Sequence, residues 1–213
     1  MVKSYRQREL ERIAVHEAGH GTFAILTGVP FRRVTILPNA QFAGHVDLGK
    51  VKPPAQVDPF NENWDVKAAR PYWAARICSA LAGALAETLY TRCWEQQSDT
   101  DEFAAREIAD CFYPPAKAAR WINRLRFQTL ESLRMPDVQA AVDAVARELL
   151  RRKSLTAAEV RVLVKRKGTP ERGPCGQRSR SLAGIRFPGP APQVAARGKR
   201  GPVSGAQSRP GTR

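Results

Sequence analysis

The chain has 213 residues, of which 43% are hydrophobic, and its formal net charge is +15. This length suits one domain with a substantial core plus an appendage, and the composition excludes a fully disordered chain. No apolar run approaches the roughly 20 residues that a membrane helix needs, and residues 1–6 lack the apolar region of a signal peptide. We therefore expect a cytoplasmic protein without a membrane segment.

The most informative pattern is His16-Glu17-Ala18-Gly19-His20, inside a helix predicted for residues 4–27. Side chains four apart on a helix share one face, so the two imidazoles can bind one Zn²⁺ ion. Glu17 is placed to take a proton from the zinc-bound water, whose pKa the ion lowers to about 7. The pattern H-E-x-x-H thus predicts a zinc peptidase with Glu17 as general base, although it also occurs by chance on ordinary amphipathic helices.

A catalytic zinc ion needs a third protein ligand, and several residues offer one. His45 is a weak candidate because it follows a glycine on a predicted strand. The acid-rich stretch 98–101, with Asp99 and Asp101, precedes another predicted helix; these acids either cap that helix or supply a ligand. Glu87 lies among apolar residues near the end of a helix that starts at about residue 65. It is either partly exposed or a hydrogen-bond partner that orients a ligand histidine.

The other elements predict a mainly α fold, a helical bundle with a small β-hairpin. Two short β-branched or alternating runs, 33–38 and 44–48, form the hairpin. Apolar stripes predict further helices over 116–133, 136–153 and 156–167, and we expect Phe103 and Phe127 to face the core.

Residues 168–213 differ in composition from the body at 1–167. They hold nine glycines, seven prolines and few large apolar side chains, so we expect a disordered tail. Nine Lys and Arg residues against one acid give this tail more than half of the net charge. Phe187 is its one aromatic residue that could stack on a base, so we do not expect the tail to bind nucleic acid.

Several segments, in order, resemble the peptidase domain of the FtsH-type membrane AAA proteases. Residues 16–20 resemble its H-E-A-G-H helix, residues 34–38 its V-T-I-x-P strand, and residues 82–88 its G-G-R-x-A-E-E helix. The similarity covers roughly residues 5–167, with Ala82, Ala84 and Thr88 replacing a glycine, an arginine and a glutamate of the family pattern. The family's membrane segments and ATPase module have no counterpart here.

The resemblance also implies a particular ligand set. The family's third zinc ligand is an aspartate in a helix start of the form S-x-D-(apolar)-x-x-A-T-x-I-A, and alignment on Ala105, Ile108 and Ala109 places it at Asp101 rather than Asp99. A zincin-like FtsH-type fold would then bind Zn²⁺ through His16, His20 and Asp101.

The sequence therefore predicts a zinc-dependent metalloendopeptidase acting on flexible peptides or unfolded proteins. A separate ATPase or a homo-oligomer are the partners we consider. The alternative is a non-catalytic, zinc-stabilised interaction module that docks on a partner ATPase or protease. The intact Glu17 disfavours this alternative, because a purely structural zinc site has no use for a base.

Overall fold

The computed structural model describes residues 4–40, 42–48, 53, 57–58, 61–62, 64–91 and 99–168. The predicted tail at 168–213 lies outside these residues apart from Gly168. Within the described part the fold is mainly helical, as predicted, with six helices and three short strands. In chain order these are α1 (Tyr5–Thr27), β1 (Arg33–Thr35), β2 (His45–Asp47), α2 (Val66–Thr91), α3 (Asp99–Asp110), α4 (Pro115–Leu133), α5 (Pro136–Arg152), β3 (Ser154–Thr156) and α6 (Ala157–Gly168).

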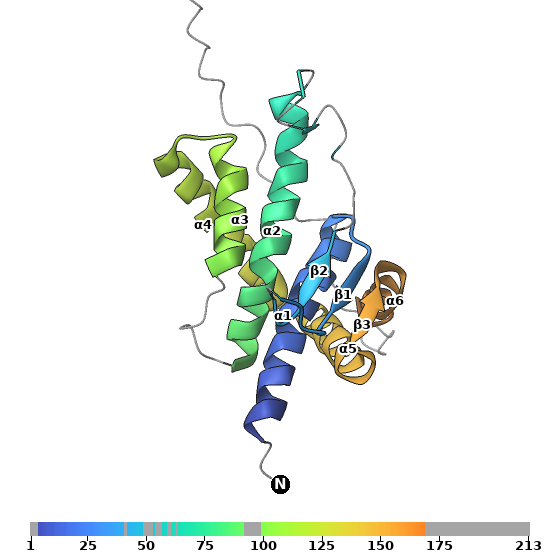
Figure 1. The fold of residues 1–213 in the computed structure, drawn as a ribbon. Helices are drawn as coiled ribbons and strands as arrows, with labels where there is room; N and C mark the ends of the chain where they lie inside the picture. The colour runs from blue at the N-terminus through green and yellow to red at the C-terminus, as the bar shows by residue number, and fades with distance from the viewer. Residues whose placement is uncertain are drawn as a thin grey trace, which may run out of the picture.

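Helices α1 and α2 run side by side through the centre of the fold (Figure 1). Helix α1 begins at the N-cap Ser4, whose Oγ accepts a hydrogen bond from the Gln7 N–H at 3.2 Å. It ends at Gly28, whose φ of 77° is the left-handed C-cap conformation that glycine adopts without strain. Where the helices meet, a Cβ on Gly19 would lie 2.6 Å from the Ala82 carbonyl oxygen, so the absence of a side chain allows the close approach.

A three-stranded antiparallel sheet, in the order β2-β1-β3, covers another side of α1. The predicted hairpin is present, but the prediction was incomplete because β3 pairs with the other edge of β1. Val34 is paired with Val46 of β2 and with Leu155 of β3. A three-residue strand carries too little periodicity to be recognised locally, and its partner is more than a hundred residues away. The sheet packs on α1 where Val34 Cγ2 fills the space above Gly21.

Helices α3 and α4 lie on the opposite side of α2 from the sheet (Figure 1). One cluster of buried apolar side chains includes residues of all six helices, β1 and β3. The expectation for Phe103 and Phe127 was wrong: they are 64% and 63% exposed. Helix α3 packs through small residues, Ala105 and Ala109, so its phenylalanine stays outside. No helix in the described ranges is both long and apolar enough to cross a membrane.

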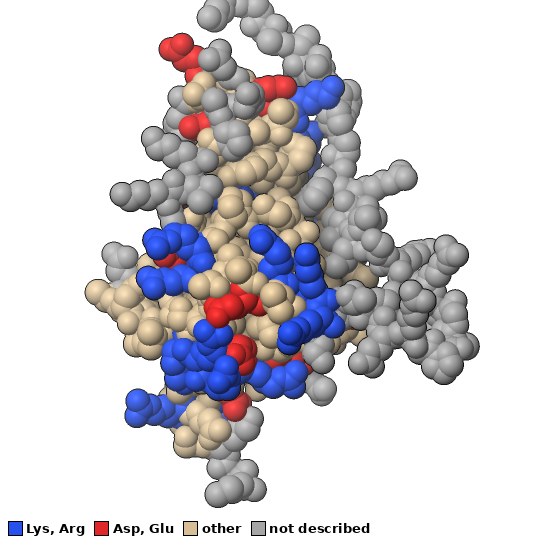
Figure 2. Space-filling model, turned by 90° about the vertical axis from the view of Figure 1, so that its right-hand side faces the viewer, with Lys and Arg blue, Asp and Glu red and all other residues tan. Residues whose placement is uncertain are grey.

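Basic side chains gather on the face that Figure 2 presents. In Figure 1 the end of α5, β3 and α6 lie on the side of the fold that Figure 2 turns toward the viewer. Two acids of this segment, Glu148 and Glu159, form ion pairs with its arginines. The Arg152–Glu159 ion pair, at 2.6 Å, joins α5 to α6 within this region. Between positions 147 and 166 the basic residues are Arg147, Arg151, Arg152, Lys153, Arg161, Lys165 and Arg166.

Candidate metal centre

Three predicted ligand side chains from two helices converge on one point. His16 and His20 project from the same face of α1, and their Nε2 atoms lie 3.0 Å apart. Asp101, in the first turn of α3, brings its Oδ2 to 3.1 Å from His16 Nε2 and 3.4 Å from His20 Nε2. The three side chains are only 11–20% exposed. The fold therefore places an aspartate 81 residues after His20 against the histidine pair.

Helix α2 determines which nitrogen of each imidazole faces the centre. His20 Nδ1 lies 2.8 Å from the Ser79 carbonyl oxygen, which can only accept, so this nitrogen carries a hydrogen. His16 Nδ1 lies 3.0 Å from Glu87 Oε2 and donates to that carboxylate in the same way. In a neutral imidazole the other nitrogen is then an acceptor. When both imidazoles are neutral, their Nε2 lone pairs therefore point at each other and at Asp101.

Three converging acceptors repel each other unless a cation or protons lie between them. Burial disfavours the charged imidazole, but the contacts with Asp101 and Glu87 outweigh it and raise the pKa of His16 to about 10. Burial likewise opposes the Asp101 carboxylate, yet the two histidines hold the pKa of Asp101 well below its usual range. A fold that stabilises positive charge here is suited to a divalent cation.

The donor set and spacing fit zinc. Tetrahedral ligands at 2.0–2.1 Å from Zn²⁺ are about 3.3 Å from each other, and the observed separations are 3.0, 3.1 and 3.4 Å. Two imidazole nitrogens and one carboxylate oxygen are a common protein set for catalytic zinc, which leaves the fourth position for water or substrate. Within the described residues, His16, His20 and Asp101 are the group with this capacity.

Glu17 lies beside this centre and is 5% exposed. The start of β2 packs on it so closely that a Cβ on Gly44 would lie 2.9 Å from Glu17 Oε1. None of the described residues gives Glu17 Oε2 a hydrogen bond. Burial raises the pKa of Glu17. A buried carboxylate with an unused oxygen can hold and transfer a proton, which is the property of a general base.

Sequence reasoning missed the part that Arg12 plays. The H-E-x-x-H pattern does not include Arg12, yet this side chain is half-buried and its Nη1 lies 2.5 Å from Glu87 Oε1. A second contact, also 2.5 Å, joins Arg12 to Glu9. Although burial opposes the charge, the bonds to His16 and Arg12 lower the pKa of Glu87, so it remains an acceptor for His16. The available signal was spacing, because Arg12 precedes His16 by four residues and shares its helix face.

Gly83 was also missed as a site residue. A Cβ there would lie 2.3 Å from His20 Nε2, so the imidazole occupies the space that a side chain would take.

The other ligand candidates behave differently. His45 does not belong to the convergent group. Val34 contacts α1, so its partner Val46 faces α1 as well, and strand alternation turns the neighbouring His45 to the other face. Asp99 begins α3, but its side chain lies outside the described residues.

Comparison with known proteins adds no family assignment, since no protein-family model and no curated protein sequence matches the chain.

Proposed function

We propose that this protein is a zinc-dependent metallopeptidase with a zincin-like, FtsH-type peptidase fold. One observation carries the proposal: the acceptor atoms of His16, His20 and Asp101 converge at ligand spacing next to the buried carboxylate of Glu17. A structural zinc site is normally closed by a fourth protein ligand, whereas three ligands plus an adjacent base are the composition of a hydrolytic site. This combination supports a catalytic role over an interaction module.

The residues of the site have different roles in the proposed peptide hydrolysis. A bound Zn²⁺ ion supplies Lewis acidity toward water and the peptide carbonyl. Glu17 Oε2 accepts one proton from the attacking water and passes it to the leaving nitrogen as the C–N bond breaks. The products are an amine and a carboxylic acid, whose remaining proton passes to the amine at neutral pH. Glu87 and the Ser79 carbonyl hold the two imidazoles in the orientation that ligation requires.

We propose flexible peptides and unfolded polypeptides as substrates. Hydrolysis at a partly buried site requires an extended segment to enter it, and a folded substrate would have to be opened first. A separate ATPase is the partner that would supply this step.

The deciding experiment compares wild type with Glu17→Gln for zinc content and for hydrolysis of casein and fluorogenic peptides. We expect one zinc per chain in both proteins and a loss of hydrolysis of at least about 100-fold in the variant, the usual size of a general-base contribution. Full hydrolysis by Glu17→Gln would refute the mechanism. One bound zinc without hydrolysis by the wild type would favour the interaction module.

A further inference from the structure

The third ligand is held less securely by its own helix than the two histidines are. His16 and His20 lie inside the 23-residue α1, with helical turns on both sides. Asp101 is the third residue of α3, in the turn whose N–H groups have no partner four residues earlier. Helix ends of this kind fray. The position of Asp101 therefore depends on contacts between α3 and other elements.

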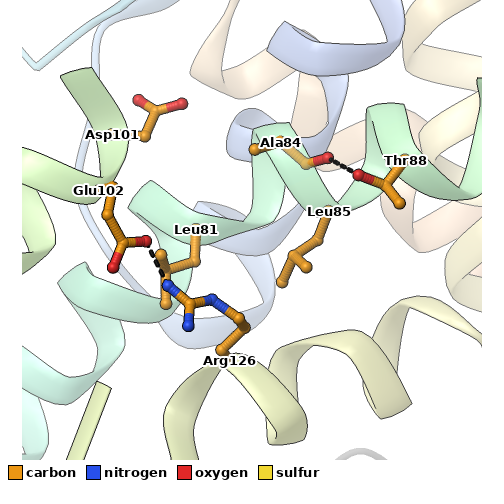
Figure 3. Close-up of a pocket in the computed structure, with 7 residues that line it drawn as sticks. All are labelled: Leu81, Ala84, Leu85, Thr88, Asp101, Glu102 and Arg126. Carbon is orange, nitrogen blue, oxygen red and sulfur yellow. Dashed lines mark hydrogen bonds and ion pairs between the residues drawn. The ribbon is translucent and has the colours of Figure 1, made fainter. Parts of the chain in front are cut away.

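Among the described side chains of this first turn, few are buried against other elements. Thr100 is exposed, Phe103 is 64% exposed, and the nearest fully buried residue of α3 is Ala105, one turn further on. Glu102 is the exception, because its Oε2 forms an ion pair with Arg126 Nη2 of α4. Figure 3 shows Asp101 and Glu102 leaving the turn in different directions, with Glu102 directed at Arg126.

Arg126 is itself well placed to act as an anchor. Its other terminal nitrogen, Nη1, donates to Asn123 Oδ1 at 2.7 Å, which fixes the guanidinium plane. Its neighbours Ile122 and Leu125 are 2% and 0% exposed, so α4 is firmly packed in the core.

Arg126 also lines a small cavity with Leu81 and Leu85 of α2. Asp101 and Glu102 border the same cavity (Figure 3).

We propose that Arg126 is a positioning residue for the metal site: through Glu102 it holds the first turn of α3 so that Asp101 reaches the histidine pair. The proposal rests on the zinc site proposed above. Arg126 acts through Glu102 and is not itself one of the three ligands, so its loss weakens metal binding without removing a donor atom.

The test measures Zn²⁺ affinity of the full chain by competition with a chelating dye, and the visible absorption of the Co²⁺-loaded protein. We expect Arg126→Met to weaken zinc binding about three- to fivefold, the effect of losing one partly exposed ion pair. Its Co²⁺ spectrum should shift toward that of Asp101→Ala. Arg126→Lys should recover part of the affinity, because a cation again faces Glu102.

Arg124→Met is the matched control, since Arg124 lies on the same helix, is exposed and undergoes the same change of charge. It should bind zinc as the wild type does. In a Glu102→Gln background, Arg126→Met should have no further effect. An Arg126→Met protein with wild-type affinity and Co²⁺ spectrum, or additive losses in the double variant, would overturn the proposal. Failure of the wild type to bind zinc would instead overturn the proposed function.

Discussion

At the level of single side chains, the position of His20 depends on the absence of a side chain at Gly83. The imidazole of His20 lies over Gly83, where α2 has no Cβ, and the same face of α2 offers the Ser79 carbonyl to His20 Nδ1. Residues 79 and 83 are one turn apart, so acceptor and gap lie next to each other. Helix propensity favours alanine over glycine by roughly 1 kcal/mol, which the packing of His20 overrides.

Gly83→Ala is therefore expected to damage the metal site in spite of the better helix former. The new methyl group would overlap the imidazole at 2.3 Å and push His20 out of line. We expect zinc affinity to fall about 10- to 100-fold, as for the loss of an orienting contact, measured by dye competition. Circular dichroism should show that α2 is retained. Unchanged zinc affinity would mean that the ring has another position from which to bind the metal.

At the level of helices and strands, the last residue of β3 is also the N-cap of α6. The Oγ1 of Thr156 accepts a hydrogen bond from the Glu159 N–H at 3.3 Å, and the Thr156 N–H donates to Glu159 Oε2 at 2.7 Å. This reciprocal pair is a capping box. The bonds from Thr156, followed by Arg152, lower the pKa of Glu159 to about 2. The contribution of this carboxylate to stability is thus present above its ordinary pKa of 4.5 and is lost as the pH falls toward 2.

Thr156→Val tests the importance of this junction. The isosteric change removes the capping oxygen, so we expect the free energy of unfolding to fall by about 1 kcal/mol and Tm by roughly 2–4 °C at neutral pH. Val162→Thr, the reverse exchange at an exposed position of α6, should change stability by no more than about 0.5 kcal/mol. Equal losses in the two variants, measured by thermal unfolding, would show that the cap contributes nothing specific.

For the complete fold, the proposed metal joins parts of the chain that are distant in sequence. Its ligands come from α1 and α3, and the α1 histidines are oriented by α2. A ligand that binds only the folded state at 100 times its Kd adds about 2.7 kcal/mol, or roughly 5–11 °C in Tm for a chain of this size. We expect EDTA to lower Tm of the zinc-loaded protein by this amount. Asp101→Ala should lose most of the effect, whereas Asp99→Ala should keep it.

The zinc effect should also depend on pH. The raised pKa of His16, about 10, means that its proton stabilises the metal-free fold fully below pH 6.5, and this contribution is lost as the pH rises toward 10. Zinc must displace that proton, so the stabilisation of the fold by zinc increases as the pH rises from 6.5 toward 10. The difference in Tm between zinc-loaded and EDTA-treated protein should therefore be larger at pH 8.5 than at pH 6.5. A smaller difference at the higher pH would contradict the statement that His16 carries an extra proton in the metal-free fold.

The features readable from the sequence alone depend on local geometry. Spacing of four residues puts His16 and His20 on one helix face, and helical periodicity predicted the mainly α fold. The candidates for further site residues also came from local context: Glu87 from its apolar surroundings and the Asp99–Asp101 pair from a helix start. The choice between these two aspartates required the family resemblance, because both positions suit a helix N-terminus.

Only the tertiary structure decided which residues meet. Nothing local connects β3 to β1, Arg12 to Glu87, Gly83 to His20 or Arg126 to Glu102, because each pair is brought together by helix and strand packing over long stretches of chain. The same packing turned His45 away from α1 and left Phe103 and Phe127 in solvent. The spacing of residues in the sequence determines which side chains share a face of one helix or strand. Which faces of different elements meet is decided when their apolar side chains are buried together in a common core.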